Sequence, residues 1–219
     1  MHGLIELADI AADLLARIRA RRPSVHCITN SVAQQYTANM LLAAGAVPSM
    51  TIAPGEIGAF VAGADALLVN LGTFDGERKS AVEAALAAAA GKPWLLDPVF
   101  VERSAARAAF ARQLVDRRPT AVRLNQAEFA ALASEGVPAE HFAKTHGSVV
   151  ALTGEVDLVV DGERRATIAN GDPLMGLVTA MGCAGSALVC AALAVEADAW
   201  LAAVAAVAAL GVAGEVAAQ

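Results

Sequence analysis

The sequence is poor in charged and aromatic residues, and this excludes several classes of protein. Aspartate, glutamate, lysine and arginine make up 17% of the 219 residues, and aromatic residues make up 4%. Hydrophobic residues reach 57%, which is typical of a folded globular chain rather than a disordered one. Because the formal net charge is −6, we expect no basic groove for nucleic acid.

Cysteine is scarce, and its spacing favours neither disulfides nor zinc. The chain has Cys27, Cys183 and Cys190, an odd number without a Cys-x-x-Cys pair. This usage fits a reducing compartment. Residues 1–20 carry acidic side chains and predict an amphipathic helix rather than a signal peptide, so we expect a cytoplasmic protein.

Long uninterrupted hydrophobic runs are also missing, and we expect no membrane-spanning segment. The apolar run 200–213 is dominated by alanine and is shorter than a membrane span, so it predicts a buried or subunit-contact helix. We find no internal repeat and no linker. The length fits one α/β domain over 1–219.

None of the strong short catalytic motifs occurs in the chain. There is no Walker A lysine loop, no GxGxxG, no GxSxG and no HExxH. His26 stands alone near the start of a predicted strand, which favours a structural role over a catalytic one. The functional argument therefore depends on the order of weaker signals.

Predicted strands and helices alternate along the chain, which indicates an α/β layered fold. Two further helices are predicted at the C-terminal end, and the Asp-Gly pair at 161–162 predicts a hairpin. The predicted strands are 25–29, 66–70, 94–96, 121–124, 149–153 and 158–160, and the predicted helices between them are 31–44, 80–90 and 126–134.

Polar residues repeatedly follow the predicted strands. They are Asn30, Asn70, Asp97, Asn125 and Thr153. In open α/β sheets ligands bind outside the carboxyl ends of the strands, so these residues are candidates for one site. For Thr153 a simple turn explains the pattern as well as a nucleotide contact does.

The segment 170–186 is the most informative part of the chain, because a polar turn leads there into small residues and then into the start of a long apolar helix. Gly182 and Gly185 allow a ligand close to the backbone, and a helix N-terminus favours an anion such as phosphate. Cys183 would have its thiolate stabilised by the same helix dipole. A buried cysteine in a helix contact is the alternative.

Acidic and basic residues near two strand ends suit phosphate and metal chemistry. Asp97 at a strand end could hold Mg²⁺, or it could cap the following turn. Asn125 and Glu128 form a capping-box pattern, although Glu128 could also act as a second acidic group near metal-bound phosphates. Arg123, upstream of them, could reach a phosphate.

Eight strings in a fixed order resemble the hydroxyethylthiazole kinase family of thiamine salvage. The likeness runs from about residue 23 to the last helix, and the strings together are far more specific than any one of them. They are VHCITN at 25–30, YTANMLLAAGA at 36–46, PSM at 48–50, NLGT at 70–73, LDPV at 96–99, NQAE at 125–128, TGEVD at 153–157 and GDPLM at 171–175.

The resemblance implies a three-layer ribokinase-like fold with a mostly parallel central sheet and helices on both faces. It implies ATP-dependent phosphorylation of the primary hydroxyl of 4-methyl-5-(2-hydroxyethyl)thiazole with Mg²⁺, in homotrimers with sites at subunit interfaces. The implied site residues are Met50 and Ala180 against the thiazole, Arg123 and Thr153 against ATP, Cys183 in place of the catalytic aspartate of related sugar kinases, and Asp97 and Glu128 near metal and phosphates.

The chain departs from the family pattern around the implied phosphate site. Ala180 and Leu124 replace glycines, Leu177 replaces a lysine, and the glycines usual after Asp-Pro-Val are missing from 100–103. Met181 could narrow the anion pocket. Two alternatives therefore stay open, namely a catalytically impaired thiazole-binding homologue and a kinase for another small heterocyclic alcohol.

Overall fold

The structure is a computed structural model that describes residues 4–219, with side chains from residue 7 onward. Within this part of the chain one sheet has the strand order β2-β1-β3-β4-β5-β6-β7-β8. Strands β1 to β6 pair in parallel, and β7 and β8 add antiparallel hairpins at one end. The strands are β1 (Ser24–Ile28), β2 (Val47–Ser49), β3 (Ala66–Asn70), β4 (Trp94–Asp97), β5 (Ala121–Asn125), β6 (Val149–Thr153), β7 (Asp157–Val160) and β8 (Arg165–Ile168).

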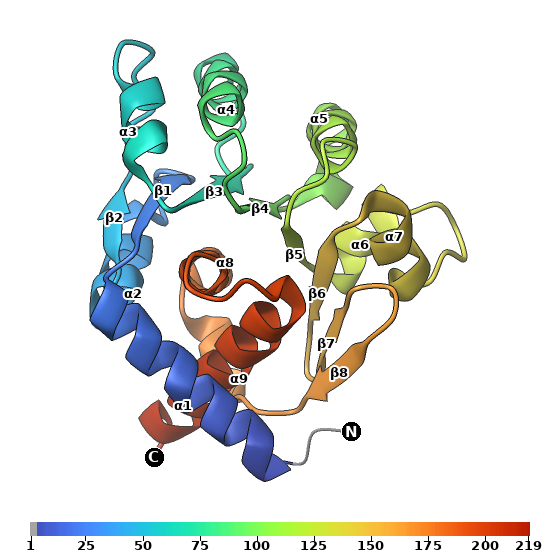
Figure 1. Ribbon diagram of the computed structural model, residues 1–219. Helices are drawn as coiled ribbons and strands as arrows, with labels where there is room; N and C mark the ends of the chain where they lie inside the picture. The colour runs from blue at the N-terminus through green and yellow to red at the C-terminus, as the bar shows by residue number, and fades with distance from the viewer. Residues whose placement is uncertain (1–3) are drawn as a thin grey trace.

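Helices cover both faces of this sheet, which confirms the expected three-layer α/β architecture with a mostly parallel central sheet (Figure 1). Helices α3 to α7 share one hydrophobic cluster with the sheet, and α1, α2, α8 and α9 share the other. The helices are α1 (Leu4–Arg21), α2 (Gln34–Ala44), α3 (Ile57–Gly63), α4 (Gly76–Ala88), α5 (Ala105–Val115), α6 (Gln126–Leu132), α7 (Ala139–His146), α8 (Met181–Leu193) and α9 (Ala199–Ala217), with 3₁₀ turns η1 (Val101–Arg103) and η2 (Pro173–Leu177).

The central strands are apolar on both faces because both faces are covered. Successive residues of a strand point to opposite sides. Leu67 and Leu96 accordingly belong to the cluster with α3 to α7, whereas Leu68 and Leu95 belong to the cluster with α8 and α9. This double burial explains why β3 and β4 read as continuous apolar runs rather than alternating ones.

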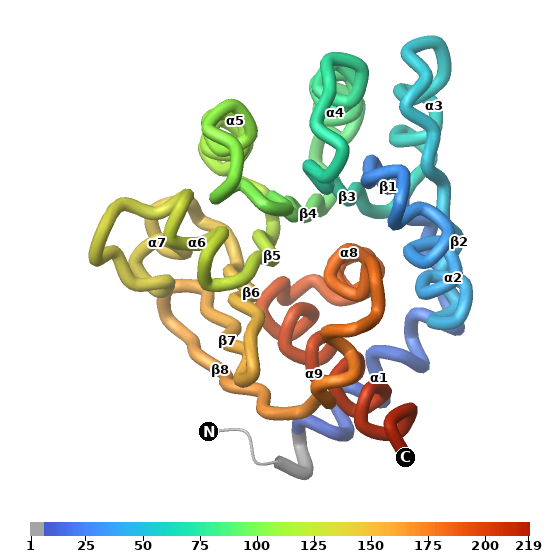
Figure 2. Tube along the Cα trace, turned by 180° about the vertical axis from the view of Figure 1, so that it is seen from behind, coloured from blue at the N-terminus to red at the C-terminus, as the bar shows by residue number. Residues whose placement is uncertain are grey.

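Helix α8 is the central helix of its layer. It packs beneath β3 and β4, while α9 packs against α1, α8 and strands β6 to β8 (Figure 2). By length and composition alone α9 could cross a membrane. Residues 202–208 are buried inside the molecule, which confirms the prediction for this part of the run 200–213, whereas Val212 near its end is 46% exposed.

The sequence predicted the buried strands better than the peripheral elements. Residues 66–70 and 149–153 match β3 and β6, and the predicted hairpin joins β7 and β8. It missed the short elements β2, α3 and α7, and it also missed the 11-residue helix α5. Helix α4 begins earlier than predicted, because Asp75 accepts a hydrogen bond from the amide of Arg78 and caps it.

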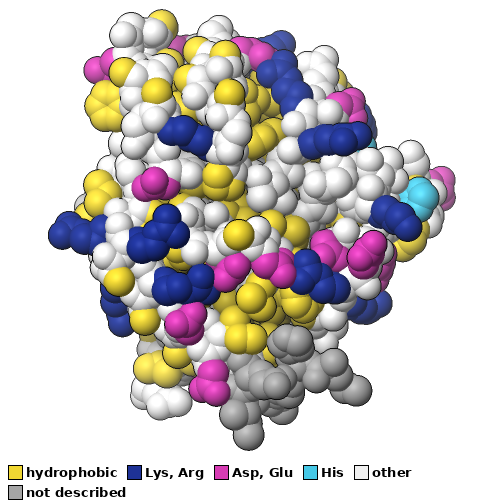
Figure 3. Space-filling model, viewed as in Figure 1, with side chains coloured by type: hydrophobic (Ala, Val, Ile, Leu, Met, Phe, Trp, Pro, Cys, Tyr) yellow, Lys and Arg dark blue, Asp and Glu magenta, His cyan; other side chains and the backbone are white. Residues whose placement is uncertain are grey.

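Acidic and basic side chains are interspersed on the face seen in Figure 3, with apolar side chains between them. Several of them form ion pairs between elements. Arg17 of α1 pairs with Glu196, and Arg164 pairs with Asp198 at the start of α9. These pairs are partly exposed, so each contributes modestly to stability.

Candidate active site

A cavity of about 550 Å³ opens at the carboxyl ends of the central strands. Residues that follow β1, β3, β4 and β5 line it, together with the last residue of β6 and the start of α8. This is the edge at which an open α/β sheet binds ligands. The cavity therefore gathers residues that lie up to 153 positions apart, as the contact between Asn30 and Cys183 shows.

Asp97 is the buried carboxylate of this cavity. It ends β4, beside Asn70 at the end of β3, and only 6% of its surface is exposed. Its Oδ2 atom accepts hydrogen bonds from Asn70 Nδ2 at 2.8 Å and from Ser186 Oγ at 2.7 Å. Burial raises the pKa of Asp97 to about 6, and the nearby Arg123 guanidinium and these hydrogen bonds limit the rise.

Glu128 has a structural role that accounts for both of its carboxylate oxygens. Oε2 accepts from the amide of Asn125 at 2.8 Å, which completes the predicted capping box at the start of α6. Oε1 accepts from the amide of Phe100 at 2.8 Å. Each oxygen keeps a further lone pair, so Glu128 fits a contact through water better than direct metal coordination.

The side chains of the cavity suit a Mg²⁺ ion that has few protein ligands and is otherwise held by phosphates and water. Within residues 4–219 no group of three or more His, Cys, Asp or Glu side chains converges on a metal position. Magnesium is typically bound by one or two carboxylates together with substrate phosphates and water. Asp97 lines the cavity and can supply one such carboxylate, since its Oδ1 atom is not used by Asn70 or Ser186.

The start of α8 has the geometry of an anion site. Ala180 adopts a left-handed backbone with φ 68° and precedes the first helical turn. The amides of Gly182 and Cys183 lie in that turn, where helix geometry leaves them without an intrahelical acceptor. Arg123 donates from Nη1 to the carbonyl of Gly182 at 2.8 Å, which brings a cation beside the same turn.

Cys183 lines the cavity, but it is not an activated thiolate. Asn30 donates from Nδ2 to its Sγ at 3.2 Å. Burial, together with the charge of Asp97, raises the pKa of the Cys183 thiol to about 11. The prediction of a stabilised thiolate is wrong, because burial and the charge of Asp97 favour the neutral thiol.

The two asparagines of the predicted strand-end set connect Cys183 to Asp97. Asn30 Nδ2 lies 3.5 Å from Asn70 Oδ1, and Asn70 in turn donates to Asp97. Gly72 allows this approach, because a Cβ at that position would lie 2.5 Å from the Cβ of Asn30. Hydrogen bonds thus connect Asn30, Asn70, Asp97 and Cys183 without a break along the side of the cavity next to β1 and β3.

The structure brings most of the predicted site residues together. The ones on the cavity wall are Asp97, Arg123, Glu128, Thr153, Ala180, Gly182 and Cys183. Met50 does not line it and packs against the core cluster of α8 and α9. Gly185 does not line it either, because it lies one turn into α8, where a Cβ would be 2.8 Å from Leu210.

The structure also shows the surroundings of Met181 and Ala180, two positions at which the sequence departs from the family pattern. Met181 packs against the core and does not line the cavity, so it does not narrow the anion pocket. Ala180, which stands where the family pattern has a glycine, has a left-handed backbone with φ 68°. His26 has its predicted structural role, since it is buried and its ring nitrogens contact Ser49 Oγ at 2.8 Å and the Thr51 carbonyl at 3.0 Å.

The sequence analysis missed several residues of the cavity wall as functional residues, and it also missed Ser186, which does not line the cavity but donates to Asp97. Ser186 could have been found from its spacing, because it lies three positions after Cys183 and so shares its helix face. Val99, Phe100 and Arg107 carried no such signal. They reach the cavity through the turn after β4 and through α5, neither of which follows from local sequence pattern.

Comparison with known proteins agrees with this geometry. A model described as the hydroxyethylthiazole kinase family matches residues 15–219. A probable hydroxyethylthiazole kinase of Agrobacterium fabrum is 44% identical over 222 residues, covering 100% of this chain and 86% of that protein. A hydroxyethylthiazole kinase of Klebsiella pneumoniae is 45% identical, covering 90% of this chain and 84% of that protein.

Solved structures lead to the same family. The structure of a hydroxyethylthiazole kinase protein from Pyrococcus horikoshii has a TM-score of 0.85 and 35% identity, covering 90% of this chain and 81% of that one. An ADP complex of Bacillus subtilis pyridoxal kinase, at 19% identity and a TM-score of 0.61 over 84% of this chain and 87% of that one, shares the fold alone. On its sequence and its fold, this chain belongs to the hydroxyethylthiazole kinase family.

Proposed function

We propose that this protein transfers the γ-phosphoryl group of ATP to the primary hydroxyl of 4-methyl-5-(2-hydroxyethyl)thiazole, as a step of thiamine salvage. One observation carries the proposal beyond family membership. A buried carboxylate, a helix N-terminus with free amides and an arginine line a single cavity at the strand ends. Phosphoryl transfer depends mostly on positioning and on charge stabilisation, and these groups supply both.

The nucleotide side of the cavity lies over β5 and β6. Arg123 and Thr153 end up on its wall, and Arg123 is held by its hydrogen bond to the Gly182 carbonyl. In our proposal both residues contact ATP. The amides of Gly182 and Cys183 stabilise negative charge that develops on the transferred group, as preorganised donors do in an oxyanion hole.

Asp97 would hold Mg²⁺ together with the phosphates of the nucleotide, and Glu128 would contact the ion through water. When bound, Mg²⁺ offsets the charge of the phosphates. The protein contributes the fixed orientation of Asp97, whose Oδ2 is held by Asn70 and Ser186. This arrangement leaves Oδ1 for the ligand.

The acceptor side lies over β1 and β3. Cys183 and Asn30 are in contact there, and the neutral thiol orients the attacking hydroxyl rather than removing its proton. Ala180 contacts the thiazole from the start of α8. Met50 lies outside the cavity of one chain, so we propose a homotrimer in which a neighbouring copy completes the site. The three free cysteines suit a cytoplasmic location.

The test is ADP release from MgATP with and without the thiazole, with the phosphorylated product identified by mass spectrometry. We expect thiazole-dependent turnover in the wild type. Thiazole binding by calorimetry without turnover would instead favour the impaired binding homologue. Neither binding nor turnover would direct the search to other heterocyclic alcohols, assayed by the same ADP release.

Cys183→Ala tests the role of the thiol in that assay. We expect kcat to fall by about tenfold, less than the roughly 100-fold or larger loss that follows removal of a general base. Cys190→Ala is the matched control, because Cys190 lies buried two turns farther along α8 and away from the cavity. Full activity of Cys183→Ala would remove the thiol from the mechanism.

A further inference from the structure

The turn after β4 has an unusual backbone. Val99 has φ 36° and Phe100 has φ 54°, so two consecutive residues with bulky side chains adopt the left-handed region. This region is a genuine outlier for a β-branched or bulky residue. Thr73 and Ala180 also have positive φ, and all four of these residues line the same cavity. Backbone strain of this kind often accompanies a functional role.

Two charged side chains, one from α5 and one from α6, form hydrogen bonds with the backbone of this turn. Arg107 of α5 donates from Nη1 to the carbonyl of Val99 at 2.5 Å. Glu128 of α6 accepts from the amide of Phe100 at 2.8 Å. Arg107 and Glu128 line the cavity themselves. The left-handed turn is therefore built into the site.

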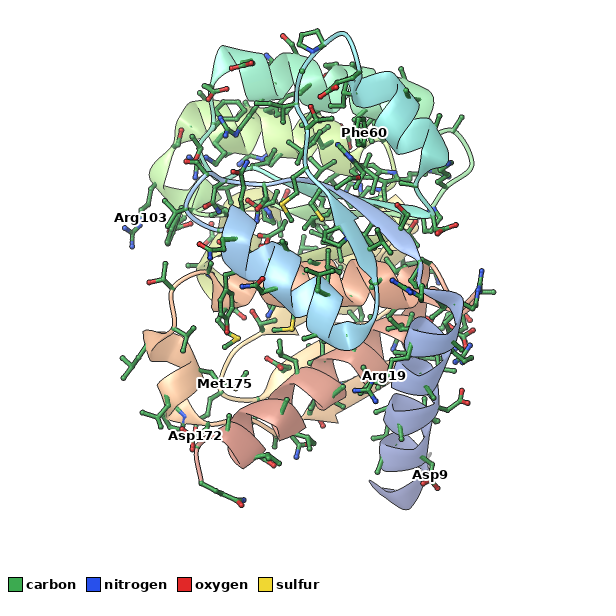
Figure 4. All side chains as sticks on the ribbon, turned by 90° about the vertical axis from the view of Figure 1, so that its left-hand side faces the viewer. Asp9, Arg19, Phe60, Arg103, Asp172 and Met175 are labelled. Atoms are coloured by element: carbon green, nitrogen blue, oxygen red, sulfur yellow. The ribbon has the colours of Figure 1, made fainter. Side chains whose placement is uncertain are left out.

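The side chain of Phe100 remains at the surface of the cavity instead of joining the core. Half of it is exposed, at 50%. The guanidinium carbon of Arg103 lies 4.8 Å from the centre of its ring, at a distance typical of a cation–π contact. Arg103 itself projects outward from the molecule (Figure 4). The guanidinium group of Arg103 thus stabilises the position of the Phe100 ring through a cation–π contact.

The position of this ring limits what it can do. Its amide is bonded to Glu128, and Asp97 lies three residues before it, so its surroundings are the proposed phosphate and metal groups. In the sheet, β4 also lies between β1 and β3, where we place the thiazole, and β5 and β6, where we place the nucleotide. An apolar ring offers no ligand to phosphate or metal, but it can exclude water from a charged site.

We propose that Phe100 covers the point of phosphoryl transfer and restricts water as a competing acceptor. This inference rests on the proposed kinase function. In the competing reaction the oxygen of water attacks the γ-phosphorus and the bond to the bridging oxygen of ADP breaks. ADP and inorganic phosphate form, and the proton of the water goes to solvent.

Three substitutions of Phe100 separate the effect of the apolar ring from the effect of the backbone conformation. Phe100→Gly removes the ring and relieves the left-handed strain, so the variant is expected to fold. Phe100→Asn also removes the apolar cover, but asparagine tolerates the left-handed region and keeps the turn less mobile than glycine does. Phe100→Leu keeps an apolar cover. Phe60→Ala is the matched control, because Phe60 is 44% exposed on α3 and lies apart from Arg103 and the cavity (Figure 4).

The measurement is phosphate release from MgATP without any acceptor, followed by the ratio of phosphorylated thiazole to ADP when thiazole is present. We expect acceptor-free hydrolysis to rise by about tenfold in Phe100→Gly and Phe100→Asn. Phe100→Leu and Phe60→Ala should stay close to the wild type. The product ratio should fall in the first two variants only.

Equal hydrolysis in all five proteins, or a rise in Phe100→Gly alone, would overturn the inference. The second outcome would assign the effect to backbone mobility. Failure of the proposed function is recognised separately, because it is the absence of phosphorylated thiazole in the wild type. The acceptor-free arm then still decides the role of Phe100.

Discussion

At the scale of single residues, the site depends on a carboxylate that the protein keeps in an unfavourable place. Asp97 is buried with its charge offset only in part by Arg123, Asn70 and Ser186. Such a group reduces stability at neutral pH, and in our proposal it is retained because it holds the metal ion and the nucleotide phosphates. The cost is local to one side chain and can be measured there.

Asp97→Asn should stabilise the protein while abolishing turnover. The pKa of Asp97 in the folded chain, about 6, lies above its ordinary value of 3.8. Between these values the unfolded chain releases the proton first, so the free energy of unfolding falls as pH rises from about 4 to 6. The amide oxygen of the substituted side chain can still accept from Asn70 and Ser186.

Thermal unfolding as a function of pH checks this prediction. We expect the variant to be more stable than the wild type by about 1–3 kcal/mol at pH 8 and equally stable near pH 4. Asp65→Asn is a suitable control, because Asp65 is an exposed carboxylate that accepts from the amide of Ser24 far from the cavity. A difference independent of pH would contradict the assigned pKa.

At the scale of the element, α8 carries much of the site because of how it begins. Ala180 provides the left-handed residue before the first turn, and small residues follow it. Farther along, Gly185 brings the helix close to Arg123, since a Cβ there would lie 3.0 Å from Nη2. The glycine predicted to bind an anion instead lets the helix approach the arginine.

Ala180→Gly should stabilise the chain by about 0.5–1 kcal/mol, because glycine adopts the left-handed region without the penalty that alanine incurs. Ala184→Gly is the matched control, and we expect it to lower the stability instead of raising it. It places the same substitution inside α8, where glycine costs about 1 kcal/mol. Urea unfolding of both variants measures the difference, and destabilisation of both would contradict the role of φ at position 180.

At the scale of the whole molecule, one edge of the sheet is left with apolar surface. Strand β2 ends the sheet, and exposed apolar residues include Val47 on it and Leu42 on the neighbouring α2. An open edge of this kind is available for association with another chain. Val32, at the mouth of the cavity, is exposed as well.

Light scattering tests the proposed trimer. We expect the mass of three chains for the wild type and a lower mass for Leu42→Asp, because the substitution places a charge at a residue that is 59% exposed and apolar. Val156→Asp is the control, since Val156 is similarly exposed in the turn between β6 and β7. A monomeric wild type, or dissociation by both variants, would contradict this interface.

The sequence by itself determined what depends on neighbouring residues. Apolar runs predicted β3 and β6, and the spacing of Asn125 and Glu128 predicted the cap of α6, because strand burial and helix capping are local. The ordered motifs were also sufficient to identify the family and the strand-end residues of the site.

Only the tertiary structure decided properties that depend on distant segments. Burial and the charge of Asp97 raise the pKa of Cys183, and Arg107 with Glu128 holds the turn of Val99 and Phe100 in a backbone that these side chains disfavour. Met50 likewise lies outside the cavity that the motifs predicted. The physical reason is the same each time, since solvation, charge and strain are set by atoms close in space, and a sequence orders residues only along the chain.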